Sequence, residues 1–297
     1  MSVVINTNVD SIKIQSILNS STDKLSQSMQ RMSTGLKINS AKDDAAGTVI
    51  ASKMNVQLNG NEIAQKNVQN ASALLSTAEG NIDVVSDNLA RIRDLTLQAK
   101  NGTYSDDEIA AMDNEVQERI AEINRVSDSA KYSSSKLFDG DGEAKTFQVG
   151  SNAGDDNTIT AKANIFKSVE FSAISGLQNF SLKSLKAGAP TVKGGLESAE
   201  AGNVTDNYDK AIVQLDKGID DLSSRKSEIG SAGNRLDSAL STLTTQYENL
   251  SSSKSLITDA DIATEASNFT QNQILQQIST SLLAQANSAP SIAMSLI

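Results

Sequence analysis

Two long stretches of the chain carry apolar residues at alternating intervals of four and three, the spacing of a helix face that packs along a neighbour. The first stretch covers 64–99 without a break, and the second covers 208–250 with interruptions at Lys226 and Gly233. The sequence therefore predicts two long helices. The first would run over about 44–100, a length of roughly 84 Å, and needs partners along that length.

The residues at these spaced positions define the two predicted seams. The first seam contains Ala64, Val68, Ala71, Leu75, Ala78, Ile82, Val85, Leu89, Ile92, Thr96 and Ala99. The second seam contains Tyr208, Ile212, Leu215, Ile219, Leu222, Lys226, Ile229, Gly233, Leu236, Leu240, Leu243, Tyr247 and Leu250.

A third helix is predicted directly after the first. Asn101-Gly102 ends the first helix, and Ser105 with Glu108 has the spacing of a capping box, which starts a helix. One face of that helix would carry Ile109, Met112, Val116, Ile120, Ile123 and Val126.

Both ends of the chain also have helical apolar patterns. A stripe near the start contains Leu18, Leu25, Met29, Met32 and Leu36. No charged residue follows Glu265, and the uncharged segment 266–297 contains Phe269, Leu275, Ile278 and Leu282 among many Gln and Asn residues. Such a helix is poorly suited to water and too polar for lipid, so protein on all sides is its expected environment. An ordinary core helix within the chain is the alternative.

Glycine and aromatic residues gather in the segment 140–204. This composition predicts turns, short strands and a small compact unit. The chain outside this segment is predicted to be helical, so the expected fold class is mainly α, a bundle of long antiparallel helices with a small β-hairpin subdomain.

Composition excludes several kinds of function. The chain has no Cys and no His, which removes thiol nucleophiles, His acid–base chemistry and Cys/His zinc sites. Its net charge of −10 disfavours nucleic acid and anionic lipid. No signal peptide or membrane-spanning run is found, so general secretory rules predict a cytoplasmic protein unless a dedicated route exports it. No cofactor is expected.

Three weak motifs have plainer explanations. The acidic run 139–143 resembles the start of a calcium loop but lacks the Gly and Glu that the loop needs later, so a turn is expected. Asp43 and Asp44 could be paired catalytic carboxylates, but capping of the following helix explains them better. Ser40 with Lys42 lacks a pocket for a catalytic dyad. The chain is not expected to be an enzyme.

Several motifs resemble those of bacterial flagellins. The block 29–47 (MQRMSTGLKINSAKDDAAG) and the opening residues 5–8 resemble the flagellin N-terminus, while 281–287 (SLLAQAN) and 295–297 resemble its C-terminus. The segment 147–154 is similar to the family hairpin. The resemblance covers roughly 1–155 and 205–297, and suggests a short form without large outer domains.

This resemblance implies a structural subunit of the bacterial flagellar filament, exported unfolded by a type III route and located outside the cell. The terminal helices would pair on assembly in an inner coiled coil, with Leu18, Leu25, Met29, Met32, Leu36, Phe269, Leu275, Ile278 and Leu282 packing there. The implied parts are an N-terminal inner-core helix and spoke (1–44), N-terminal shell helices (45–139), a small β-rich or irregular segment (140–204), a C-terminal shell helix (205–252) and a C-terminal inner-core helix (253–297).

The resemblance also implies partners. These are further copies of the chain, the hook–filament junction protein, the filament cap protein and an export chaperone that binds the C-terminal helix, with no nucleic acid and no membrane insertion. Arg91, Leu95 and Glu115 resemble the contacts of the vertebrate Toll-like flagellin receptor and are also expected to contact neighbouring subunits. Arg91 and Leu95 lie off the predicted seam, so packing within the chain is not expected to need them.

One related class and two unrelated classes remain as alternatives. They are a hook–filament junction protein, a secreted coiled-coil translocator and an enzyme displayed on a filament. The sequence departs from the family at Gly233, where Gln is usual and where a glycine would weaken the seam. Ile262 and Lys13 are further departures. Because the terminal stripes have no evident partner within the chain, residues up to about 40 and beyond about 256 are expected to be disordered before assembly.

Overall fold

The structure is a computed structural model that describes residues 7–187 and 204–294, with side chains described between 205 and 288 in the second part. The motif residues 5–6 and 295–297, and the segment 188–203 of the predicted irregular region, lie outside the described residues. The chain divides into two compact units, Met1–Asn59 with Gln246–Ile297 (unit 1) and Gly60–Thr245 (unit 2), which are described separately below.

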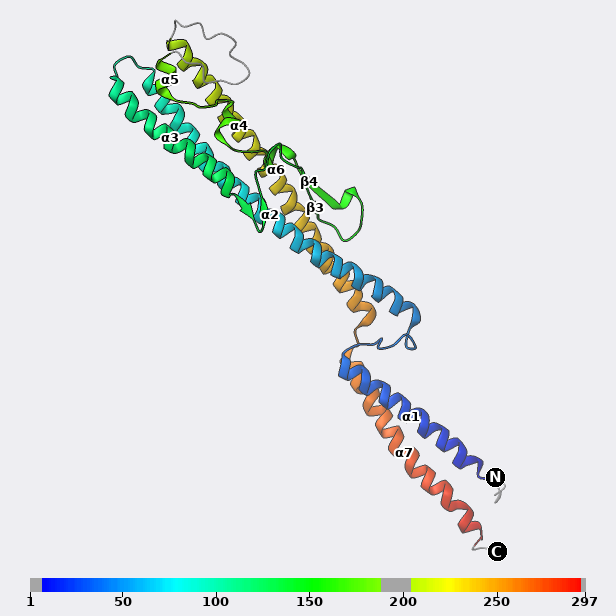
Figure 1. The fold of residues 1–297 in the computed structure, drawn as a ribbon. Helices are drawn as coiled ribbons and strands as arrows, with labels where there is room; N and C mark the ends of the chain where they lie inside the picture. Colours follow the sequence, from blue (N-terminus) through cyan, green and yellow to red (C-terminus); the bar gives the residue numbers. More distant parts are fainter. Residues whose placement is uncertain (1–6, 188–203, 295–297) are drawn as a thin grey trace. The chain divides into compact units, whose positions relative to one another are not determined.

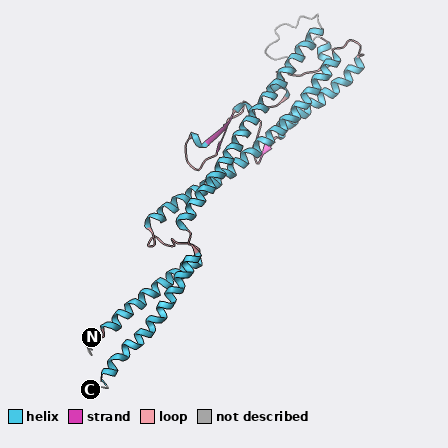
Figure 2. Ribbon diagram, turned by 180° about the vertical axis from the view of Figure 1, so that it is seen from behind, coloured by secondary structure: helices cyan, strands magenta, loops and turns pink. Residues whose placement is uncertain are grey.

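Long helices account for most of the described chain (Figures 1 and 2), which confirms the predicted fold class. In chain order the helices and strands are α1 (Val9–Thr34), α2 (Ala45–Ala99), α3 (Asp106–Ser129), β1 (Lys131–Tyr132), β2 (Ser135–Lys136), β3 (Lys145–Gln148), β4 (Thr158–Ala161), α4 (Phe171–Ser175), α5 (Leu182–Lys186), α6 (Val204–Thr258) and α7 (Ile262–Met294). Short 3-10 turns, η1 (Asp155–Asn157) and η2 (Ala163–Phe166), flank β4.

In unit 1 the two terminal helices α1 and α7 lie side by side and antiparallel (Figure 1). The side-chain amide of Asn8 donates to the Ala286 carbonyl over 2.7 Å, and the side-chain amide of Gln276 donates to the Thr22 hydroxyl over 3.1 Å. The expectation that these helices have no partner within the chain is therefore wrong, because each is the partner of the other.

In unit 2 the first predicted seam is confirmed. Every seam position from Ala64 to Ala99 is no more than 4 % exposed. The capping box at the start of α3 is also confirmed, because the Ser105 side chain and Glu108 satisfy each other's backbone amides. On the face of α3, Ile109, Val116, Ile123 and Val126 are buried, and Met112 and Ile120 are partly buried.

The second predicted seam, on α6, is correct only at every other position. Tyr208, Leu215, Leu222, Ile229, Leu236 and Leu243 are buried as predicted, but the intervening buried positions are Ala211, Gly218, Arg225 and Ala232. The pattern selected the neighbouring residues at 212, 219, 226 and 233, of which only Ile212 and Ile219 are bulkier than the buried residue before them. Small residues occupy close approaches instead: a Cβ on Gly218 would lie 3.0 Å from side chains of Leu89 and Ile174.

Ion pairs set the antiparallel register of α2 and α6 within unit 2. Lys100 pairs with Asp209, Arg93 with Asp216, and Asp83 with Lys226. The steps of seven and ten residues between successive members are the same along both helices. Lys226 is therefore a paired residue at the edge of the seam and does not interrupt it.

The segment after α3 is partly strand and partly helical turn. Strands β3 and β4 form the expected antiparallel hairpin, with Phe147 opposite Ile159, and Gly150 approaches Asn157 too closely to carry a Cβ. The following residues 162–187 lie over α3 and are here called the strap. The backbone amide of Leu182 donates to the Asp113 carboxylate over 2.7 Å, and the side-chain amide of Gln117 donates to the Phe180 carbonyl over 2.7 Å. The strap's aromatic side chains belong to the same core as the helices.

Two glycines of α6 test this seam assignment. A Cβ on Gly233 would meet nothing within 4 Å, so Gly233→Ala should raise the free energy of unfolding of unit 2 by about 0.5–1 kcal/mol through helix propensity. Gly218→Ala gains the same propensity but overpacks the contact with Leu89 and Ile174, and should lower stability by about 1 kcal/mol. Thermal unfolding of both variants checks this. A stabilising Gly218→Ala or a destabilising Gly233→Ala would contradict the seam seen here.

Candidate assembly surfaces

A corner in unit 1 joins α1 to the junction between α6 and α7. Gly35 ends α1 in the left-handed conformation, with φ of 72°. The Lys37 amide then donates to the Thr258 carbonyl over 2.7 Å, and the Ala260 amide donates to the Gly35 carbonyl over 2.9 Å. These two hydrogen bonds form a short antiparallel bridge between the segment that follows α1 and the segment that precedes α7.

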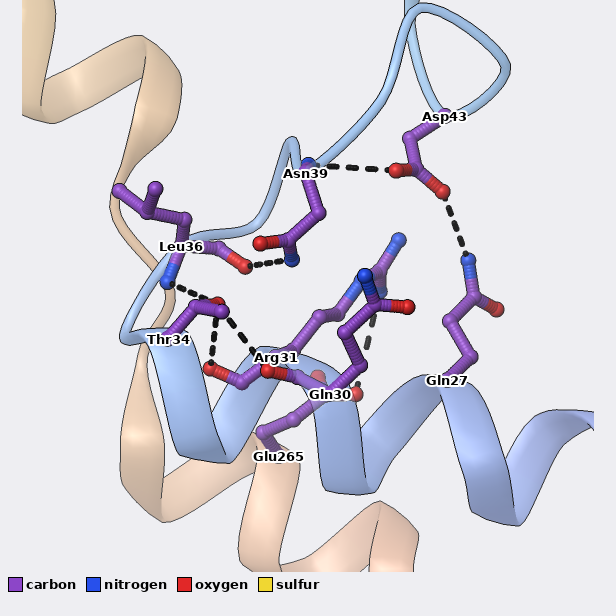
Figure 3. Close-up of polar contacts among 8 residues, drawn as sticks. All are labelled: Gln27, Gln30, Arg31, Thr34, Leu36, Asn39, Asp43 and Glu265. Carbon is purple, nitrogen blue, oxygen red and sulfur yellow. Dashed lines mark hydrogen bonds and ion pairs between the residues drawn. The ribbon is translucent and has the colours of Figure 1, made fainter.

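Asp43 organises the loop between α1 and α2 (Figure 3). Its carboxylate accepts from the amides of Asn39 and Ser40, at 3.2 and 2.9 Å, from the Ser40 hydroxyl, and from the Gln27 side chain on α1. These hydrogen bonds, above all that from the Ser40 hydroxyl, lower the pKa of Asp43 below its usual 3.8. Asp43 therefore stabilises the loop, and this structural role replaces the alternative that Asp43 and Asp44 are paired catalytic carboxylates.

The two acidic residues beside this corner act as helix caps. Asp44 accepts from the Gly47 amide over 2.9 Å at the start of α2, as the capping interpretation predicted. Asp261 accepts from the Ala263 amide and the Thr264 hydroxyl at the start of α7, and the hydroxyl bond holds its pKa below the usual value. Gly47 lies in the first turn of α2, and a Cβ there would lie 2.5 Å from the Asp44 carboxylate and 2.6 Å from the Ile38 side chain, so a larger residue would displace these two side chains.

The interior of the α1–α7 pair mixes polar and apolar side chains. Ser21, Ser28 and Ser279 are buried in it, each no more than 5 % exposed. Arg31 reaches Glu265 over 3.8 Å, as Figure 3 shows, and Glu265 is itself buried. Polar positions therefore share this interface with half-buried apolar ones.

The predicted inner-core residues divide between two faces. Leu18, Leu25, Met32 and Phe269 are half-buried along the inside of the pair. The others are exposed: Met29 is 53 %, Leu36 37 %, Leu275 40 %, Ile278 48 % and Leu282 47 % exposed. With Ile274, the residues Leu275, Ile278 and Leu282 form one stripe along α7, here called the outer stripe, whose side chains are about half exposed.

The sequence did not predict the buried serines of this pair. The segment from Glu265 to Ala286 does contain the signal, since positions 265, 269, 272, 276, 279, 283 and 286 keep a 4–3 spacing. Most of these positions are polar, and a search for apolar residues passes over them.

The second candidate surface is in unit 2, where α3 folds back beside α2. Arg91 makes two hydrogen bonds to the Glu115 carboxylate, of 2.9 and 3.2 Å, and Arg119 makes a third of 3.1 Å. These bonds, that from Arg91 first, lower the pKa of Glu115 and raise that of Arg91. The turn at 101–104 thus brings Arg91 and Glu115 together, and Arg119 is a member that the sequence did not indicate.

Leu95 does not belong to this exposed surface. It is 2 % exposed and is among the largest fully buried side chains. The expectation that packing within the chain does not need Leu95 is wrong, because α2 contacts both α3 and α6 and its buried face is wider than a single 4–3 seam.

A hollow of about 450 Å³ lies beside the corner of unit 1. Its lining is mainly hydroxyl and amide side chains, including those of Ser40, Asn55, Ser251 and Ser255. Among the described residues no group of three or more acidic side chains is placed to hold a metal ion. Within the described helices, none has the length and apolar character needed to cross a membrane.

These features define a class of protein: a long-helix structural subunit with apolar helix faces left uncovered for other chains. The model of the bacterial flagellin N-terminal helical region matches residues 5–143, and that of the bacterial flagellin C-terminal helical region matches 212–297. The chain belongs to the bacterial flagellin family.

Individual relatives agree with this assignment. A flagellin of Xenorhabdus nematophila is 38 % identical over 321 aligned positions, and one of Serratia marcescens is 37 % identical over 357, with all of both chains covered in each case. A solved structure described as a flagellar hook-associated protein from Vibrio parahaemolyticus is similar with a TM-score of 0.57 and 16 % identity, covering 72 % of this chain and 99 % of that one. At this identity the similarity concerns the fold alone.

Membership of the family gives the function in outline. Flagellins are structural proteins that polymerise into the flagellar filament, so this chain is a filament subunit and not an enzyme.

The corner should weaken as acid protonates its carboxylates. The pKa of Asp43 is lowered in the folded chain, so its contribution to stability is complete above the usual 3.8 and is lost as the pH falls through the lowered value. We expect Asp43→Asn to speed amide exchange at Asn39 and Ser40 at neutral pH, with the difference from wild type vanishing in acid. The control is Asp23→Asn, at an exposed position of α1, which should not change amide exchange at Asn39 or at Ser40. A pH-independent effect of Asp43→Asn would contradict the role given to its charge.

Alanine substitutions at the two predicted receptor residues of α2 should differ sharply in their cost to the free energy of unfolding. Leu95→Ala removes a fully buried side chain and should cost about 2–5 kcal/mol. Arg91→Ala removes a largely exposed ion pair and should cost about 0–1 kcal/mol. Denaturant unfolding of the two variants measures both values. Similar costs for both would mean that Leu95 is not part of the core.

Proposed function

We propose that the chain polymerises through the outer stripe of α7 together with the exposed apolar residues of α1. The observation that supports this is the distribution of side chains in the terminal pair, whose interior contains buried serines while Met29, Ile278 and Leu282 are about half exposed. In water this arrangement leaves apolar area uncovered. Contact with further copies would cover it.

The energies favour assembly over the isolated pair. Full burial of one large apolar side chain is worth about 1.5–3 kcal/mol, and half of such area is still available at each residue of the outer stripe. By contrast, hydrogen bonds such as that between Gln276 and Thr22 contribute only about 0.5–1.5 kcal/mol each. We therefore propose that the pair is marginal in the free subunit and becomes stable when the stripe is covered, which retains part of the predicted disorder before assembly.

Export and location follow from the same proposal. A terminal pair that is marginal on its own would unfold readily for passage through a narrow type III channel, and would fold again at the filament outside the cell. The uncharged segment after Glu265 suits burial between subunits better than it suits water.

We assign the finer partners to the same surfaces. An export chaperone would bind α7 through its outer stripe, which makes chaperone binding and polymerisation mutually exclusive. The hook–filament junction protein and the cap protein would meet the terminal helices at the two ends of the filament. A vertebrate Toll-like receptor would contact Arg91 and Glu115, without Leu95, and neighbouring subunits would compete for the same pair of side chains.

Charge placed on the outer stripe tests the proposal. Leu282→Glu and Ile278→Glu each put a carboxylate where other copies would cover it, at a cost of several kcal/mol for an unpaired buried charge. We expect both variants to fail to form filaments after seeding, as measured by light scattering and electron microscopy. The thermal transition of unit 2 should be unchanged.

The control puts the same charge on another face of the same helix. Gln277 is exposed and lies between the positions that carry the outer stripe and those that face α1. Gln277→Glu should polymerise nearly as wild type does. Normal filaments from Leu282→Glu, or equal failure of Gln277→Glu, would show that the outer stripe is not the particular surface that drives polymerisation.

A further inference from the structure

The chain contains the dipeptide Asn-Gly twice, in two different structural settings. Asn101-Gly102 lies in the turn between α2, which ends at Ala99, and α3, which begins at Asp106. Asn59-Gly60 lies inside α2. The same two residues can therefore be compared in one molecule, with and without helical hydrogen bonding.

The turn leaves both reacting groups of Asn101-Gly102 free. Asn101 and Gly102 are exposed, and neither the side-chain amide of Asn101 nor the backbone amide of Gly102 has a hydrogen bond in the described structure. A Cβ built on Gly102 would meet nothing within 4 Å. The backbone nitrogen of Gly102 can thus approach the side-chain carbonyl carbon of Asn101 without breaking a contact.

The helix blocks this approach at Asn59-Gly60. In the interior of α2 the Gly60 amide donates to the carbonyl four residues earlier, as in any α-helix. Ser151 also covers Gly60, since a Cβ built there would lie 2.7 Å from the Ser151 Cβ. The nitrogen could attack only after the helix opened locally.

From this contrast we propose that Asn101 is a site of spontaneous deamidation and isoaspartate formation, and that Asn59 is protected. The Gly102 nitrogen loses its proton and forms a bond to Cγ of Asn101, while the bond from Cγ to Nδ2 breaks and ammonia leaves. Water then opens the resulting five-membered imide at either carbonyl. The product at this position is either an ordinary aspartate or an isoaspartate in which the main chain runs through the former side chain. Water is the only co-reactant.

The product changes the charge of a sensitive place in unit 2. A new carboxylate would lie just after the last turn of α2, where the helix dipole disfavours negative charge. It would also lie near Asp209, which pairs with Lys100, and near the acidic first turn of α3. The net charge of −10 would become one unit more negative. The modified chain should therefore have a lower isoelectric point and a weaker Lys100–Asp209 register contact.

Peptide mass mapping of the purified full chain, incubated at mildly alkaline pH and physiological temperature, tests the proposal. The peptide containing Asn101 should gain about one dalton roughly tenfold faster, or more, than the peptide containing Asn59, because a helix interior reacts only through local opening. In denaturant the two sites should react at the same rate, since the dipeptide is the same.

A substitution separates chemistry from fold. Gly102 does not have a positive φ in the left-handed range, and its surroundings are open, so Gly102→Ala should fold normally. The added methyl group hinders attack by the backbone nitrogen and should slow the reaction at Asn101 several-fold. Equal rates at Asn101 and Asn59 in the folded chain would overturn the proposal. So would an unchanged rate in Gly102→Ala.

Discussion

A pair of helices can bury only one face of each member, and this geometric limit governs the terminal part of the chain. In α1 and α7 the buried faces carry Ser21, Ser28 and Ser279, so the apolar residues of the outer stripe remain in water. A globular protein would place these residues inside. On the proposed assembly, other copies would cover these exposed faces in the filament and so stabilise the pair.

Unit 2 satisfies the same constraint within a single chain. Helix α2 packs against α6 and α3, and Val169, Phe171 and Phe180 of the strap join the same buried core, although Leu97 and Val213 stay about half exposed. The ion pairs Lys100–Asp209 and Arg93–Asp216 then fix one register among several that a uniform apolar seam would allow. Unit 2 therefore contains its own core, whereas the outer stripe of unit 1 stays exposed in the single chain and, as proposed, would be buried only by neighbouring copies.

The sequence predicted the long helices well because α2 carries its core residues at an unbroken 4–3 spacing, and because Asn101-Gly102 marks a helix end and Ser105 with Glu108 a helix start. The prediction failed at positions where the buried residue is small or polar, because the search used only the spacing of apolar residues. On α6 the close approach to Leu89 and Ile174 needs Gly218, which a search for bulky apolar residues ignores. Leu95 was misplaced because a single seam was assumed for a helix with two neighbours. The strap over α3 could not be predicted, since Asp113 and Gln117 reach its backbone from a distant part of the sequence.

Buried polar groups in unit 2 help to select the register of its helices. Asn61, on the α2 seam, is 1 % exposed and its Oδ1 has no hydrogen-bond partner among the described residues, a cost of about 1–3 kcal/mol. Arg225 is 4 % exposed and donates to the Lys167 carbonyl over 2.9 Å. A single polar residue in a seam penalises shifted pairings more than it penalises the native one. Within the chain, polar groups thus select one alignment of the helices at some cost in stability. In the proposed assembly the apolar stripe, which has no such selectivity, would supply the free energy of contact between copies.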